Sequence, residues 1–226
     1  MKKFVILFCL LAMYLLPTAA QIKPTIAVLG DSYSTFEGFI PQGNEVWYHV
    51  PADLQHTDVT KVEQTWWWQV IKEGGYKKGM INSYSGATIC YTGYNDADYS
   101  ARSFITRATN LGNPDIILIC GATNDSWCGA PIGNYKYENW KRADLYTFRP
   151  AMAKLLNDIL VYYPNVAVYF ILNSELKEDI NTSVIEICKH YQVPVIKLHD
   201  IDKLSGHPSV KGMKSFAQQV LKVIKK

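Results

Sequence analysis

At residues 26–34 the chain reads IAVLGDSYS, an apolar run that ends in a glycine turn and a serine. The run Ile26-Leu29 is typical of a buried strand, and Gly30 permits a tight turn directly after it. Open α/β sheets bind their ligands at the carboxyl ends of their strands, and this is where the turn delivers Ser32. Ser32 is therefore the candidate nucleophile.

A serine hydroxyl is a weak nucleophile unless a base removes its proton. His207 is the candidate base, because it lies in SGHPS at residues 205–209, where glycine and proline predict a loop. Two further segments should reach the same edge of the sheet. They are NSYSGAT at residues 82–88 and GATND at residues 121–125, and the second follows the strand-like run Ile116-Cys120.

These blocks resemble those of the SGNH hydrolases, the GDSL esterase/lipase family. The nucleophile block matches residues 30–34, the second-block glycine matches Gly86, the third block matches Asn124-Asp125 and the last matches His207-Pro208. The resemblance runs from residue 25 to about residue 225. Four blocks in the family's order are far more specific than any single one, since Gly-Asp-Ser and Asn-Asp are also ordinary turn sequences.

The resemblance implies a serine esterase that works through an acyl-enzyme. Ser32 would attack an ester carbonyl while His207 takes its proton, and water would later hydrolyse the acyl-enzyme. The oxyanion hole would consist of the backbone N–H groups of Ser32 and Gly86 and the side-chain amide of Asn124. We expect no cofactor for this reaction.

The acid that should orient the imidazole is missing from its family position. In the family an Asp usually stands three residues before the catalytic His, and here that position is Leu204. Asp202 and Asp200 lie on the same loop as the histidine, and Glu175 follows a predicted strand. We choose Asp202 because it is nearest in sequence. A backbone carbonyl that holds the ring of His207 in a Ser-His dyad is the fourth alternative.

Strand-like and helix-like segments alternate along the chain, which predicts a parallel sheet wrapped by helices. The expected fold is α/β, a single-domain three-layer α/β/α sandwich with a parallel, roughly five-stranded, flavodoxin-like sheet, and the hydrolase domain spans residues 21–226. The predicted strands are 26–29, 80–84, 116–120, 166–172 and 193–198. The predicted helices are 66–73, 101–110, 145–162, 176–190 and 210–224.

Three long segments that follow strands, residues 33–64, 89–100 and 122–143, should build the substrate site. They carry many aromatic residues among Asn, Asp and Gly, of which Trp127, Tyr91 and Trp47 are the candidate substrate-binding residues. The others are Tyr48, Tyr94, Tyr135, Tyr137 and Trp140. Aromatic faces beside polar groups suit a sugar, although such rings also serve to pack loops onto a domain.

The leading functional hypothesis is an exported serine esterase that removes acetyl or similar small acyl groups from carbohydrate. One alternative is a lipase or thioesterase-like hydrolase of lipid esters, which would need an apolar groove. Another is a catalytically inactive glycan-binding relative, because the family acid is replaced by Leu204. Hydrolysis of short-chain, long-chain and carbohydrate esters would separate the three.

The first twenty residues have the pattern of a secretory signal peptide: two lysines, an apolar stretch from Phe4 to Leu16 and small residues before Gln21. We predict cleavage after Ala20 and a periplasmic or secreted protein, with an uncleaved membrane anchor as the alternative. Without residues 1–20 the chain keeps 21 basic and 20 acidic residues. This balance gives no reason to expect nucleic acid or an anionic membrane as a partner. The oligomeric state stays open.

The remaining histidines, His49, His56, His190 and His199, lack the spacing of metal ligands, and we expect no metal site. Four cysteines remain after residue 20 and are scattered along the chain. Cys90 and Cys128 both follow strands that should be neighbours, so they are the pair that a disulfide would join. The sequence leaves open whether this bond forms.

Overall fold

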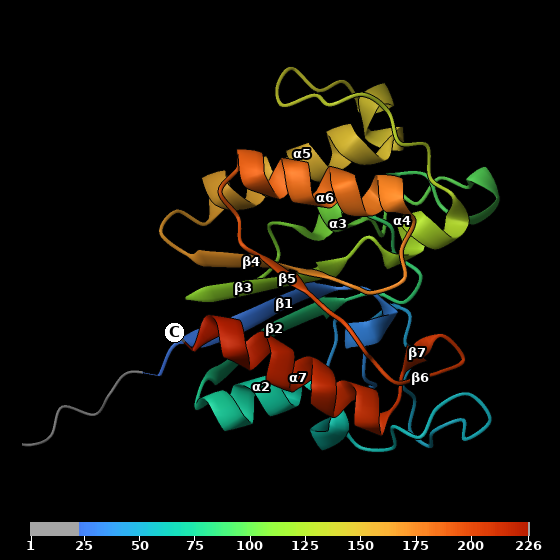
Figure 1. The fold of residues 1–226 in the computed structure, drawn as a ribbon, viewed down its shortest axis with the longest axis vertical. Helices are drawn as coiled ribbons and strands as arrows, with labels where there is room; N and C mark the ends of the chain where they lie inside the picture. The colour runs from blue at the N-terminus through green and yellow to red at the C-terminus, as the bar shows by residue number, and fades with distance from the viewer. Residues whose placement is uncertain (1–22, 226) are drawn as a thin grey trace, which may run out of the picture.

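The computed structural model describes residues 23–225. The predicted signal peptide lies outside these residues. At the centre of the described chain is a five-stranded parallel sheet with the strand order β2-β1-β3-β4-β5 (Figure 1). This is the flavodoxin-like order, and it confirms the predicted fold class. The strands are β1 (Thr25–Gly30), β2 (Lys77–Ser83), β3 (Ile116–Gly121), β4 (Ala167–Leu172) and β5 (Val195–Lys197).

The central strands are apolar along their whole length because helices cover both faces of the sheet. Alternate residues of each strand face opposite sides: Leu29 and Ile117 belong to one cluster of buried side chains, Val28 and Leu118 to the other. The edge strand β2 starts at Lys77, three residues earlier than predicted. Its first residues are exposed and polar, so they gave no apolar signal.

Helices form a layer on each face of the sheet, as Figure 1 shows. On one face lie α3 (Phe104–Arg107), α4 (Thr123–Cys128), α5 (Phe148–Tyr162) and α6 (Glu178–His190). On the other face lie α2 (Trp66–Gly74) and α7 (Val210–Ile224). The indole of Trp66 stacks on the Phe216 ring at 4.5 Å between α2 and α7. Trp66 and Trp67 are therefore core residues, consistent with their place outside the predicted site.

Two predicted helices differ most from expectation. Only Phe104–Arg107 of the segment 101–110 is α-helical. The segment 145–162 divides into a 3-10 helix, η4 (Arg142–Tyr146), and α5, because Thr147 between them adopts an extended backbone. The other 3-10 helices are η1 (Ser32–Ser34), η2 (Val62–Gln64) and η3 (Tyr94–Asp96).

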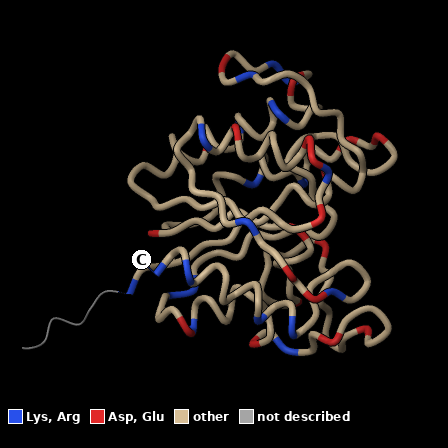
Figure 2. Tube along the Cα trace, viewed as in Figure 1, with Lys and Arg blue, Asp and Glu red and all other residues tan. Residues whose placement is uncertain are grey.

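His207, the predicted base, lies on a hairpin after β5 that the sequence did not predict. Its two strands, β6 (Lys203–Leu204) and β7 (His207–Pro208), are antiparallel and too short to give a periodic signal. Basic and acidic residues are interspersed over the outer elements, while the central strands carry few charges (Figure 2). Within residues 23–225, no helix has the length and apolarity that a membrane crossing requires.

Candidate active site

The predicted nucleophile and base are in contact. Ser32 begins η1, immediately after β1, and the Asp31 carboxylate caps this turn by accepting from the Tyr33 N–H at 3.1 Å. The Ser32 Oγ atom lies 2.9 Å from the Nε2 atom of His207. Both side chains are almost fully buried. A serine hydroxyl at hydrogen-bond distance from an imidazole nitrogen is the arrangement that proton transfer needs.

The other ring nitrogen is held by the backbone. Nδ1 of His207 lies 3.1 Å from the carbonyl oxygen of Ser205, in the β6–β7 turn. A carbonyl oxygen only accepts, so Nδ1 must carry the proton in this arrangement. Nε2 is then the unprotonated nitrogen, free to accept the Ser32 hydroxyl proton.

The three candidate acids are occupied elsewhere, so the choice of Asp202 is wrong. The Asp202 carboxylate accepts from the Ser209 hydroxyl at the start of α7. Asp200 is exposed and contacts His199 Nδ1 at 2.9 Å, and Glu175 pairs with the Lys203 ammonium at 2.9 Å. Asp202 was nearest in sequence, but the hairpin turns its side chain toward the helix rather than the imidazole.

Aromatic rings surround His207. The indole of Trp47 stacks on the imidazole with centroids 3.6 Å apart and planes 10° apart, and the Tyr33 ring lies at 5.2 Å. Burial lowers the pKa of His207 to about 4; the Lys203 charge acts in the same direction and the Ser205 carbonyl opposes it. The imidazole is therefore neutral at pH 7, the form that can accept a proton.

The three predicted substrate-binding aromatics have different surroundings. Trp127 is 43 % exposed, and its ring lies in a T-shaped arrangement with the His207 ring at 5.8 Å between centroids, so its exposed part borders the site. Trp47 instead covers the imidazole itself. Tyr91 is 9 % exposed and packs edge-on against Tyr146 at 5.5 Å, so its main contact is with another loop residue. Substrate binding by these three residues stays a prediction, and of the three the contacts bring Trp127 and Trp47 next to His207.

The predicted oxyanion donors lie on η1, on the turn after β2 and at the start of α4. Neither the Ser32 nor the Gly86 backbone N–H makes a hydrogen bond within the described chain. The Asn124 Nδ2 atom donates to the Ala87 carbonyl at 3.0 Å, next to Gly86, and keeps a second hydrogen for a ligand. Gly86 has φ of 77°, a backbone conformation that favours glycine.

Two residues that the sequence analysis did not assign to the site hold these donors in place. The Tyr94 hydroxyl donates to Asn124 Oδ1 at 2.9 Å, which fixes the orientation of the amide. Asp125 accepts from the backbone N–H groups of Ile89 and Cys90 at 2.8 and 3.1 Å. Burial raises the pKa of Asp125 to about 6, although these hydrogen bonds oppose the shift.

Two tyrosine hydroxyls hold the loop that carries the base. The Tyr33 hydroxyl donates to the Gly206 carbonyl at 2.6 Å, and the Tyr48 hydroxyl donates to the Pro208 carbonyl at 3.1 Å. The Asn173 amide, after β4, donates to the Tyr33 oxygen at 3.2 Å. The backbone on both sides of His207 is thus anchored, and one anchor is the residue next to the nucleophile.

A buried cation lies beneath the nucleophile turn. The Arg107 guanidinium donates to the carbonyls of Gly30 at 3.1 Å and Asn82 at 2.6 Å, so it joins the carboxyl ends of β1 and β2. Burial lowers its pKa to about 9, while the nearby Asp31 raises it. Burial also raises the pKa of Asp31 to about 7, against the opposing hydrogen bond from Tyr33 and the charge of Arg107. The sequence offers no signal for this pair.

The remaining loop aromatics pack on the helices. Tyr137 stacks on His190 at the end of α6, with centroids 3.8 Å apart, and the Arg149 guanidinium lies over Tyr135. The Trp140 indole lies 5.7 Å from the Lys154 ammonium. For these rings, packing of the loop onto the domain is the role that the contacts support.

The described residues hold no cluster of three or more His, Cys, Asp or Glu side chains placed to bind a metal. Cys90 and Cys128 are free thiols in this structure.

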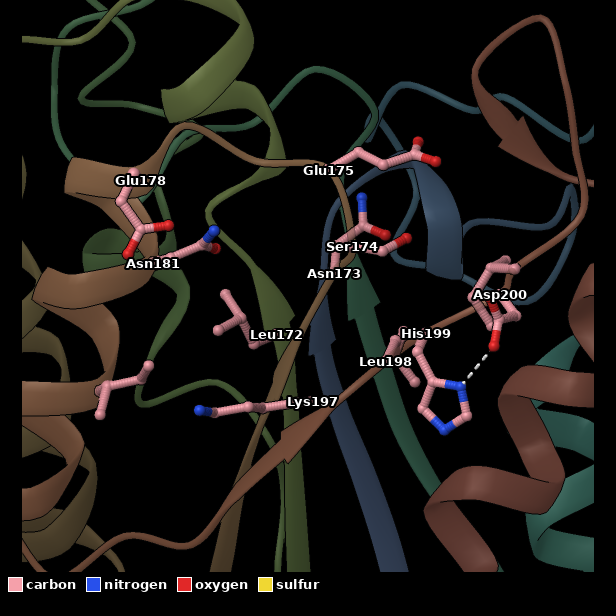
Figure 3. Close-up of a pocket in the computed structure, with 12 residues that line it drawn as sticks. Leu172, Asn173, Ser174, Glu175, Glu178, Asn181, Lys197, Leu198, His199 and Asp200 are labelled. Atoms are coloured by element: carbon pink, nitrogen blue, oxygen red, sulfur yellow. Dashed lines mark hydrogen bonds and ion pairs between the residues drawn. The ribbon is translucent and has the colours of Figure 1, made fainter.

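A polar cleft of about 540 Å³ opens beside the carboxyl ends of β4 and β5. Figure 3 shows Glu178 and Asn181 on its α6 side and Lys197 and His199 on its β5 side. Asn173, which lines the cleft, is also the residue that contacts the Tyr33 hydroxyl. The cleft and the Ser-His pair are therefore connected through two side chains, because Tyr33 in turn contacts the Gly206 carbonyl and the His207 ring.

The chain matches the family of GDSL-like lipases/acylhydrolases over residues 24–224. It belongs to this family, which confirms the predicted family and makes the protein a serine ester hydrolase. A GDSL-like lipase from Bacteroides ovatus ATCC 8483 is similar at 59% identity and a TM-score of 0.89, over 91% of this chain and 99% of that chain. A second from Bacteroides uniformis ATCC 8492 shares 54% identity with a TM-score of 0.89, over 91% and 97%.

A more distant structure shares the fold alone. It is an acetyl xylan esterase from the rumen bacterium Butyrivibrio proteoclasticus, at 14% identity and a TM-score of 0.61, over 93% of this chain and 65% of that chain. The comparison with curated proteins gives no match.

Proposed function

We propose that the protein is an exported carbohydrate esterase that removes acetyl or other small acyl groups through a Ser32–His207 dyad. The observation that carries the proposal is the 2.9 Å contact between Ser32 Oγ and His207 Nε2, together with the Ser205 carbonyl at Nδ1. The acceptor on Nδ1 leaves Nε2 as the base. A dyad without a carboxylate is also what the positions of Asp202, Asp200 and Glu175 favour.

In this mechanism the serine oxygen attacks the ester carbonyl as its proton passes to Nε2. The developing oxyanion is bound by the N–H groups of Ser32 and Gly86 and by the second Nδ2 hydrogen of Asn124. The imidazolium then gives its proton to the leaving alcohol, and the acyl group stays on Ser32. Water, activated by the same imidazole, hydrolyses the acyl-enzyme and regenerates the serine.

The carbohydrate part of the proposal rests on the surroundings of the dyad. Trp127 offers exposed aromatic surface next to His207, and such surface suits the C–H face of a sugar ring. The cleft in Figure 3 lies beside the site rather than around the dyad, and most of the residues that line it are polar or charged, a lining that suits sugar hydroxyl groups. The acetyl xylan esterase that shares the fold agrees with this class of substrate.

A panel of esters tests the proposal. Nitrophenyl acetate, butyrate, octanoate and dodecanoate are compared with acetylated xylo- and cello-oligosaccharides, with Ser32→Ala as the matched inactive control. We expect kcat/KM to fall at least tenfold from acetate to octanoate, and acetate to be released from an oligosaccharide. A rise with acyl length would favour lipid esters. Saccharide binding by a folded protein without any turnover would favour a glycan-binding relative.

Export is tested separately by expressing the full chain and sequencing the amino terminus of the mature protein. Residues 1–20 predict a mature chain that begins at Gln21 outside the cytoplasm. A cell-associated protein that retains Met1 would contradict this part of the proposal and leave the esterase assignment untouched.

A further inference from the structure

We infer that the indole face of Trp47 stabilises the imidazolium that His207 becomes during ester hydrolysis, and so performs part of the work of the missing carboxylate. The inference deepens the proposed function, because it concerns a positioning residue of the same dyad. It rests first on geometry: the two rings lie parallel, with centroids 3.6 Å apart and planes within 10°.

The site lacks a negative charge that would stabilise the imidazolium, and the Trp47 contact can supply part of that stabilisation. When Ser32 attacks, its proton moves to Nε2, and a positive charge appears on a ring that is almost fully buried. No carboxylate among residues 23–225 hydrogen-bonds to this ring, and its Nδ1 atom is held by a neutral carbonyl. A buried cation needs compensation, which the electron-rich face of an indole supplies.

The contact acts more on the transition state than on the ground state. Before reaction the ring is neutral and gains little from the indole quadrupole, whereas the imidazolium gains a cation–π attraction. Only such a difference raises kcat. The other groups around the ring do not stack on it in this way. Lys203 is a cation that opposes the charge, and Tyr33 is a neutral phenol tilted by 59° to the imidazole. Trp127 lies farther away, at 5.8 Å between centroids and in a T-shaped arrangement.

The decisive experiment keeps the shape of the ring and changes its electrons. Tryptophan is replaced throughout the protein by 5-fluoro- and 5,7-difluorotryptophan, which weakens the π face stepwise, and nitrophenyl acetate hydrolysis is measured with each preparation. The same substitutions are made in Trp47→Phe, which retains a flat ring but carries no indole at this position. Any effect of fluorine at the other five tryptophans then appears in both series.

We expect kcat to fall stepwise with fluorination in the wild-type protein, by about threefold to tenfold in total, with KM within about twofold. In the Trp47→Phe series kcat should change much less with fluorination, by no more than Trp127 and the other remaining tryptophans contribute. Trp47→Phe should retain more activity than Trp47→Leu, and Trp140→Leu, remote from the dyad, should match wild type. A wild-type kcat that is insensitive to fluorine, or an equal slope in both series, would overturn the inference.

A second readout separates this inference from the proposed function. The titration of the His207 ring protons, followed by NMR, needs no turnover, and it is carried out on Ser32→Ala as well as on wild type. Fluorination should lower the imidazole pKa stepwise where Trp47 is present and change it much less in Trp47→Phe. Loss of esterase activity on every substrate would remove the proposed function, whereas a flat titration series would remove the role of Trp47.

Discussion

Leu204 is the direct cross-strand partner of His207 in the β6–β7 hairpin, at the position where the family usually has its acid. Opposite residues in an antiparallel pair point to the same face with Cβ atoms about 4.5–5.5 Å apart. An acid at position 204 would thus be close to the imidazole without any change in the backbone. The chain has the hairpin that would place an acid beside His207, but the side chain at that position is Leu204, so the family triad is incomplete.

Leu204→Asp should therefore restore a carboxylate beside the imidazole. A nearby negative charge favours the protonated ring, so the pKa of His207 should rise by about one unit or more, and kcat should increase. The measurement is the pH profile of nitrophenyl acetate hydrolysis. Leu204→Asn, which has the same shape and no charge, is the control and should leave the profile in place. Identical profiles for the two variants would show that the carboxylate does not reach the ring.

The three candidate acids should be dispensable for catalysis. Asp202→Asn, Asp200→Asn and Glu175→Gln should each keep kcat within about tenfold of wild type, whereas loss of a working triad acid costs about ten-thousandfold. Asp202→Asn should instead destabilise the protein by about 1 kcal/mol, because Asp202 accepts from the Ser209 hydroxyl that caps α7. Urea unfolding measures that cost. A collapse of kcat in one of the three would identify the acid.

Activity should persist to unusually low pH. The reaction needs neutral His207, and burial lowers its pKa to about 4, so protonation removes the base only as the pH falls through about 4. We expect kcat/KM to be constant from about pH 5.5 to 8. Circular dichroism at each pH distinguishes loss of the base from acid unfolding. An acid limb near the ordinary histidine pKa of about 6.5 would mean that the ring is far more solvated than this structure has it.

The oxyanion donors should affect kcat and leave KM nearly unchanged. Asn124→Ala removes one donor and should lower kcat by about a hundredfold or more. Tyr94→Phe keeps the amide but removes the hydroxyl that fixes it at 2.9 Å, so a smaller loss of about threefold to tenfold is expected. Steady-state kinetics of both variants and the double variant measure the coupling. If Tyr94→Phe lowers kcat by the same factor in the Asn124→Ala background as in the wild-type protein, the two residues act independently.

Asp31, in the nucleophile turn, should lower the free energy of unfolding as the pH increases. The pKa of Asp31 is about 7 in the folded protein against 3.8 for an ordinary Asp, so the folded state holds its proton more tightly between these values. The stability that this group contributes at low pH is therefore lost as the pH rises toward 7. Asp31→Asn should gain up to about 4 kcal/mol relative to wild type between pH 4 and 8. Urea unfolding at both pH values measures the difference, with the exposed Asp200→Asn as control.

Much of the fold, and the positions of Ser32, Asn124 and His207 in the site, can be predicted from local sequence. Apolar runs that end in Gly-Asp-Ser or Gly-Ala-Thr-Asn-Asp predict strands that deliver polar side chains to one edge, and the structure brings Ser32, Asn124 and His207 there. These features depend on residue types at fixed spacing, which a sequence displays directly. The boundaries of edge strands do not follow from local sequence, because polar residues such as Lys77 can pair in a sheet without any apolar pattern.

The remaining features depend on contacts that a sequence does not display. Every residue has a carbonyl, so nothing marks the carbonyl of Ser205 as the partner of Nδ1. Trp47 was expected to meet a ligand, and only the folded chain shows that it covers an imidazole from a distant segment. An arginine ordinarily lies at the surface. Arg107 is instead buried beneath the nucleophile turn, where backbone carbonyl oxygens accept the hydrogen bonds of its guanidinium.

The hydroxyls of Tyr33 and Tyr48, bonded to the carbonyls of Gly206 and Pro208, have a consequence for substrate binding. The entropy of fixing the base beside the nucleophile is lost when the chain folds, and it does not have to be lost again when an ester arrives. A small acetyl group offers few contacts and therefore little binding energy. Little of that binding energy is therefore available for ordering the residues of the enzyme. Because the two tyrosine hydroxyls already hold the loop of His207 in place, no binding energy is required for this step.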